Sequence, residues 1–133
     1  MVNLAQRGQN GAMSDIDGLR TRYLAAIDAV QAATEHTISA LQDTHQARGI
    51  AREAALQGRP VSELEHVIHP QALRASLSDA LGELERTRHV AQRLLFLLLQ
   101  AEGQTLADIG RMWGISRQLV SRLVNEPDPT PPV

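Results

Sequence analysis

The 133-residue sequence contains no cysteine, and this absence excludes two common ways of stabilising a small protein. Without thiols the chain cannot form disulfide bonds, and it cannot build the thiolate sites that hold structural zinc. Lysine is absent too, so all thirteen residues counted as lysine or arginine are arginines. This bias alone indicates no function, because the base composition of a genome can produce it.

Aromatic residues are almost as rare, since the chain has only Tyr23, Phe96 and Trp113. Proteins that bind RNA or single-stranded DNA stack bases on several aromatic side chains, so this composition argues against that class of partner. Runs of β-branched residues are also scarce, whereas alanine and leucine, which favour helices, are abundant. We therefore expect an all-α fold.

Long apolar segments are missing as well. The longest uninterrupted run, residues 94–99, has six residues, whereas a membrane-spanning helix needs about 20. The first residues do not show the charged start, apolar centre and small-residue cleavage site of a secretory leader. These features predict a cytoplasmic protein with no membrane partner.

The charge is unevenly distributed along the chain, although the total is only −2. Residues 1–85 carry seven arginines and eleven acids, a net charge of −4, whereas residues 86–126 carry six arginines and three acids, a net charge of +3. Asp128 supplies the remaining negative charge. A positive end on an otherwise acidic chain points to an anionic partner such as nucleic acid.

Four segments can be distinguished by composition. Residues 1–13 are polar, contain two glycines and lack periodicity, so we expect them to be disordered, with an ordered N-terminal arm as the alternative. Residues 14–85 should form a long antiparallel helical hairpin that resembles a coiled coil and provides the dimerisation region. Residues 86–126 should form a helix-turn-helix domain. Residues 127–133, with four prolines, should be a disordered tail, or at most an extended ligand for a proline-binding partner.

The first helix of the hairpin should begin near Ser14 and carry a heptad-like line of apolar and small residues. Its members recur at steps of three and four, which suits close packing against another helix: Ile16, Leu19, Tyr23, Ile27, Val30, Thr34, Thr37, Leu41 and Thr44. Gly58 and Pro60 should end the helical region, and residues 61–69 should form a short connector.

A second long helix is predicted from Pro70 to Ala101, which at 1.5 Å per residue is about 48 Å long. Two helices joined by a short connector usually lie antiparallel. Two helices alone bury little surface, so we expect either a simple hairpin or, preferably, a second copy of the chain that completes a bundle.

The last ordered segment, Thr105 to Glu126, contains a full set of helix start and stop signals. Thr105 and Asp108 have the spacing of a capping box, and Ser116 is placed as the N-cap of a second helix. Gly114 should end the first of the two helices, because glycine adopts positive φ at little cost. Pro127 should end the second.

The apolar residues of this segment recur so that they face one common core. They are Ile109, Trp113, Ile115, Val120 and Leu123. We expect Trp113 to be buried against residues 94–98 and Val120. Gly110, with almost no side-chain volume, should let another helix approach closely.

This pattern resembles the helix-turn-helix DNA-binding proteins. The segment GISRQLVSRLV is most similar to the DNA-binding end of sigma-70 region 4 and to the C-terminal domains of some recombinases. The resemblance implies that the helix beginning at Arg117 enters the major groove of DNA.

The resemblance also implies a set of contact residues. Arg117 and Gln118, at the start of that helix, suit bidentate hydrogen bonds to guanine and adenine. Ser121 and Arg122, one turn later, suit a base edge or a phosphate, and Arg111 suits a phosphate; surface solvation is the alternative for both Arg111 and Arg122. The complete predicted DNA-binding set is Thr105, Arg111, Ser116, Arg117, Gln118, Ser121 and Arg122.

Other chemistries find little support in the sequence. His66 and His69 are three residues apart, but no third ligand has a fixed spacing to them, so neither a metal nor another cofactor is predicted. Recombinases with a similar C-terminal motif need an α/β catalytic domain, which this chain lacks, so no enzymatic activity is expected. The predicted function is a homodimeric transcriptional regulator or nucleoid-associated factor that binds double-stranded DNA. The alternative is a helical protein-interaction module, for example one that docks on RNA polymerase.

Overall fold

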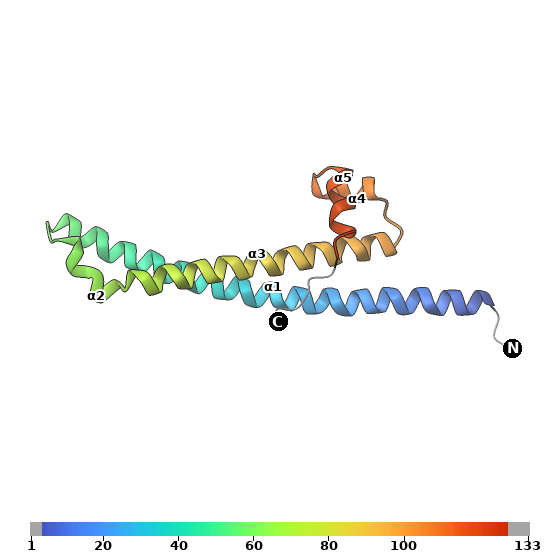
Figure 1. The fold of residues 1–133 in the computed structure, drawn as a ribbon, viewed down its shortest axis with the longest axis horizontal. Coiled ribbons are helices and arrows are strands. Elements are labelled where there is room, and N and C mark those ends of the chain that lie inside the picture. Colours follow the sequence, from blue (N-terminus) through green and yellow to red (C-terminus); the bar gives the residue numbers. More distant parts are fainter. Residues whose placement is uncertain (1–3, 128–133) are drawn as a thin grey trace. The chain divides into compact units, whose positions relative to one another are not determined.

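The structure is a computed structural model that describes the backbone of residues 4–127 and the side chains from Asp15 onward. The described residues are all-helical and contain no strand, as predicted (Figure 1). The elements are α1 (Leu4–Leu56), the 3-10 helix η1 (Val61–Leu64), α2 (Glu65–Ile68), α3 (Pro70–Ala101), α4 (Leu106–Trp113) and α5 (Arg117–Val124).

The predicted bounds of the second long helix are confirmed by α3, and the expected connector contains η1 and α2. Helix α1 begins at Leu4, within the segment 1–13 for which the sequence predicts disorder. Residues 1–3 of that segment and residues 128–133 of the proline-rich tail lie outside the described residues.

The chain divides into two compact units. One unit is Asp28–Arg88, which contains most of α1, the connector and the first part of α3. The other combines the chain before Asp28 with the chain from His89 onward, and it contains α4 and α5.

In the unit Asp28–Arg88, α1 packs against α3 through very small side chains. Every seventh residue of α1 is a buried alanine, and Ala80 of α3 is fully buried. Alanine lets two helix backbones approach closely, but each contact removes little apolar surface from water. The α1 alanines of this unit are Ala33, Ala40, Ala47 and Ala54.

Two buried threonines complete the α1 side of this contact. The Thr37 hydroxyl lies 2.7 Å from the Ala33 carbonyl oxygen in its own helix and 3.3 Å from the Ala80 carbonyl oxygen in α3. The Thr44 hydroxyl donates to the Ala40 carbonyl at 3.0 Å. Each buried hydroxyl therefore has an acceptor, which removes most of the cost of its burial.

The predicted line of contact residues on α1 is only partly correct. Thr37 and Thr44 are buried, and Tyr23 and Val30 are partly buried, as expected. Thr34 is exposed, however, and Leu41 keeps 49% of its surface exposed. Ala33 and Ala40, each one residue before these two positions, are buried instead. Steps of three and four fit either line of residues, so the sequence pattern alone does not decide between them.

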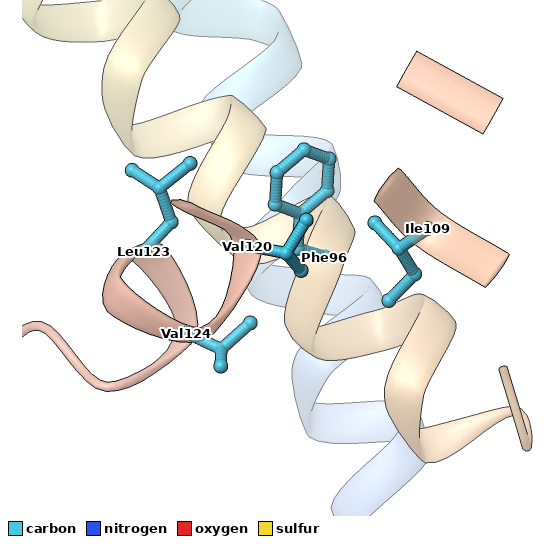
Figure 2. Close-up of a cluster of buried hydrophobic side chains, with 5 residues drawn as sticks. All are labelled: Phe96, Ile109, Val120, Leu123 and Val124. Carbon is cyan, nitrogen blue, oxygen red and sulfur yellow. The ribbon is translucent and has the colours of Figure 1, made fainter. Parts of the chain in front are cut away.

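The second unit has a conventional apolar core, built where α3 meets α4 and α5. Phe96 of α3, Ile109 of α4 and Val120 of α5 are fully buried, and Leu123 and Val124 close the cluster (Figure 2). Phe96 lies between the two short helices and contacts both. None of the described helices has an apolar stretch long enough to cross a bilayer.

Candidate functional site: the surface of helices α4 and α5

Helix α4 begins with the predicted capping box. The Thr105 side chain accepts a hydrogen bond from the Asp108 backbone N–H at 3.1 Å, and the Asp108 carboxylate accepts one from the Thr105 N–H at 3.1 Å. The hydrogen bonds from the Thr105 backbone and side chain, with a smaller contribution from Arg111, hold the pKa of Asp108 below its usual value of 3.8. The carboxylate is therefore a fixed negative charge at the start of α4.

The turn between the helices depends on two glycines. Gly114 ends α4 with φ of +67°, which is the left-handed conformation that glycine tolerates best. A Cβ atom on Gly110 would lie 2.8 Å from the Ile115 carbonyl oxygen. The same Cβ would lie 3.5 Å from the backbone nitrogen of Arg117, the first residue of α5. Gly110 is therefore required because both the turn and the start of α5 lie directly against α4.

Helix α5 begins at the predicted N-cap. The Ser116 hydroxyl accepts a hydrogen bond from the Leu119 N–H at 3.1 Å. Val120, Leu123 and Val124 face the core, so one side of the helix is held by apolar contacts. This arrangement fixes which residues of α5 face away from the protein.

The outward side of α5 carries polar and cationic groups only. Arg117, Gln118 and Arg122 are exposed. Ser121 is partly buried, and its hydroxyl accepts a hydrogen bond from the Asn125 side chain at 3.3 Å. The outward surface of α5 contains no carboxylate, so it suits an anionic or hydrogen-bonding partner.

The end of α5 is fastened to α3 by Glu126. Its carboxylate oxygen lies 2.7 Å from His89 Nε2, and its backbone carbonyl accepts a hydrogen bond from Arg93 at 2.7 Å. The sequence contains no signal for these contacts, because the residues are 37 and 33 positions apart. With the N-cap at one end and Glu126 at the other, α5 has a fixed position within its unit.

Arg111 is exposed but already has a partner. Its guanidinium forms an ion pair with the Asp108 carboxylate one turn earlier. Asp108 therefore contacts both the start of α4 and an arginine near its end. A phosphate at Arg111 would have to share or displace this carboxylate.

The predicted burial of Trp113 is wrong. The side chain keeps 46% of its surface exposed, and the neighbouring Met112 keeps 59%. Trp113 does reach the expected segment of α3, because its ring meets the Phe96 ring edge to face with centroids 5.7 Å apart. As the last residue of the short helix α4, it is covered on one side only.

The structure thus brings six of the seven predicted contact residues to the two helix starts and the outward side of α5, and it places Arg111 on the exposed side of α4. His66 and His69 lie in the other unit, beside a shallow depression that also includes Glu65. Among the described side chains, no three carboxylates or imidazoles are grouped so that they could hold a metal ion.

Comparisons of the chain with models of known protein families, with curated protein sequences and with solved structures gave no match.

Proposed function

We propose that the chain is a sequence-specific double-stranded DNA-binding protein in which α4, the turn at Gly114 and α5 act as a helix-turn-helix. The observation that carries this proposal is the outward side of α5. It presents the exposed side chains of Arg117, Gln118 and Arg122 on a helix that contains no acidic residue, is capped at one end and is fastened to α3 at the other.

The chemistry of these side chains fits the edges of base pairs. An arginine can donate two hydrogen bonds to guanine, and a glutamine can exchange two with adenine. Arg117 and Gln118 occupy the first turn of α5, the part of a recognition helix that lies deepest in the major groove. Ser121 and Arg122, one turn further on, suit a second base edge or the phosphate backbone.

The remaining predicted contacts would position the protein and not select a sequence. Thr105 and Ser116 use their hydroxyl oxygens to cap helices. The Ser116 hydroxyl hydrogen can still be donated to a phosphate, whereas the Thr105 hydroxyl also bonds the Asp108 carboxylate and would have to exchange that bond for a phosphate. Arg111 would gain a phosphate and weaken its ion pair with Asp108. Its net contribution should therefore be smaller than that of an arginine without such a pair.

A single recognition helix contacts few base pairs, and helix-turn-helix proteins commonly bind two half-sites as dimers. The proposed role is therefore that of a homodimeric transcriptional regulator or nucleoid-associated factor in the cytoplasm. One observation favours the alternative of a protein-interaction module, for example one that docks on RNA polymerase. Met112 and Trp113 form an exposed apolar pair at the end of α4, which is a common feature of protein-binding surfaces.

The test compares two arginines with different proposed roles. Arg117→Ala should flatten the sequence preference, because loss of a bidentate base contact costs about 1–3 kcal/mol at one base pair. Arg111→Ala should keep the preference and weaken binding to all duplexes alike, with a lower salt dependence. The measurement is the affinity for a site selected from a random pool and for random duplex DNA at several salt concentrations.

Both variants change exposed side chains, so circular dichroism should show an unchanged fold. If Arg117→Ala binds the selected site with the affinity and preference of the original protein, α5 is not the recognition helix. If the original protein shows no salt-dependent binding to any duplex, the protein-interaction module becomes the better hypothesis. Met112→Ala should then abolish partner binding, whereas DNA binding by the proposed helix-turn-helix would tolerate it.

A further inference from the structure

The hairpin Asp28–Arg88 has two grooves of different character, one on each side of its line of alanines. One groove contains a cavity of about 300 Å³, lined by Thr44, Arg48 and Ala51 of α1 and by several residues of α3. The other contains a cavity of about 400 Å³, lined on α1 by Asp43, Gln46 and Ile50. Ala47, Ile68 and Leu73 line both cavities. The two grooves therefore flank the contact between α1 and α3.

The groove beside Ile50 is mixed in character and more polar than the other. Its lining includes Asp43, Gln46, His69 and Ser76 beside apolar residues such as Ile50 and Val67. The same side continues along the hairpin. His36 lies one heptad before Asp43 on α1, and Glu83 lies one heptad after Ser76 on α3. His36 Nδ1 and Glu83 Oε2 form an ion pair, 3.7 Å apart. These groups are suited to water, so this side can remain exposed.

The groove beside Arg48 is apolar and extends along the hairpin. Pro70, Leu73 and Leu77 line its cavity. Leu41 lies one heptad before Arg48, and Leu81 lies one turn after Leu77, so both continue this side of the hairpin. Leu41 and Leu81 are 49% and 46% exposed. Leu64 is the only buried leucine, isoleucine or valine in the whole unit, so the hairpin alone leaves its other large apolar side chains at least partly exposed.

We propose that this apolar side, defined by Leu41, Leu73, Leu77 and Leu81, binds the same side of a second copy of the chain, so that two hairpins form an antiparallel four-helix bundle. The inference refines the homodimer of the proposed function, and it does not depend on DNA binding by α5. In such a bundle the leucines would fill the centre, and the polar sides with His36 and Glu83 would face solvent.

The charges on α3 identify a second copy as the occupant. Arg74, Leu77, Leu81 and Glu85 follow one another at steps of three and four, so they form one stripe with a cation at its start and an anion at its end. If two α3 helices cross antiparallel about a twofold axis near residue 79, Arg74 faces Glu85 of the partner subunit and Leu77 faces the partner's Leu81. The stripe is therefore complementary to itself.

Glu85 already has a partner within its own helix. Its carboxylate forms a bidentate ion pair with Arg88, at 2.7 and 3.0 Å. Both side chains are at least half exposed, so Arg74 of the partner subunit would share this carboxylate with Arg88.

The available area also matches a stable dimer. Residues 28–56 of α1 span about 43 Å and residues 70–88 of α3 about 28 Å, so two adjacent helices about 10 Å wide give each hairpin a side of roughly 700 Å². Stable protein interfaces bury about 800 Å² on each partner.

The first test uses charge reversal on the intact chain. The original protein should show about twice the 14.5 kDa of one chain in sedimentation equilibrium at micromolar concentration. Arg74→Glu and Glu85→Arg should each raise the dissociation constant of the dimer about tenfold at low salt, because each creates two like-charge contacts. The double variant should restore dimerisation. A monomeric original protein, or a double variant weaker than either single one, would overturn the proposal.

The second test compares two apolar positions. Leu81→Glu should give a monomer, whereas Ile50→Glu, which changes the groove on the opposite side of the line of alanines, should remain a dimer. Equal effects of the two variants would exclude the apolar side as the interface. Binding of random duplex DNA by each variant separates the two proposals. A dimer that binds no DNA supports this interface and refutes the proposed function. A monomeric protein that binds DNA supports the proposed DNA binding and refutes this interface.

Discussion

Replacing Gly110 by alanine should destabilise the contact between α4 and the turn that follows it. The added Cβ would lie 2.8 Å from the Ile115 carbonyl oxygen, and it would also be 3.5 Å from the Arg117 nitrogen. Both neighbours are backbone atoms, so neither can rotate away as a flexible side chain would. The turn and the start of α5 would have to move.

Two opposing effects determine the size of this change. Alanine favours a helix over glycine by about 0.5–1 kcal/mol. Overpacking in a close contact costs about 1–3 kcal/mol. We therefore expect Gly110→Ala to lower the free energy of unfolding by about 1–2 kcal/mol. Loss of DNA binding should accompany it, because α5 would no longer be held in place.

The matched control is Gly49→Ala in α1. A Cβ atom at Gly49 meets no atom within 4 Å, so only the helix-propensity gain of about 0.5–1 kcal/mol should remain. Urea unfolding followed by ellipticity gives both free energies. If Gly110→Ala is as stable as the original protein or more stable, the close approach of the turn to α4 is wrong.

Three further changes examine other parts of this unit. Trp113→Ala should cost about 2 kcal/mol, roughly half the cost of emptying a buried aromatic site, because the ring is half exposed and contacts Phe96 by one edge only; a thermal scan would show the difference. Ser116→Ala removes the N-cap of α5 and should lower the stability by about 0.5–2 kcal/mol in urea unfolding. Asp108→Asn should lower the thermal midpoint at neutral pH. The deficit should shrink below pH 3.8 and vanish as the pH falls through the lowered native pKa of Asp108, because the carboxylate stabilises the fold only while it is ionised.

The sequence predicts the local features of α4 and α5 well, because their signals lie within a few residues of one another. The capping box at Thr105, the N-cap at Ser116 and the left-handed Gly114 are all confirmed. Burial of Ile109 and Val120 follows from spacing alone and is confirmed too.

Features that depend on distant residues were missed. The fastening of Glu126 to His89 and Arg93 has no sequence pattern. The exposure of Trp113 depends on tertiary packing. Its ring meets Phe96 of α3 edge to face and still keeps 46% of its surface exposed. On α1, the sequence pattern assigns the helix contact to large apolar residues such as Leu41. The helix instead packs through Ala40 and the other buried alanines, whose small side chains contribute little to a hydrophobic pattern.

The position of the aromatic residues has a consequence for spectroscopy. Tyr23, Phe96 and Trp113 all belong to the unit that contains α4 and α5, and the unit Asp28–Arg88 contains no aromatic residue. Intrinsic fluorescence therefore monitors only the unit that contains α4 and α5, whereas far-ultraviolet ellipticity monitors the helices of both units. If the two unfolding curves have different midpoints, the hairpin Asp28–Arg88 unfolds independently of the helices proposed to bind DNA. Coincident curves would show that the two units unfold together.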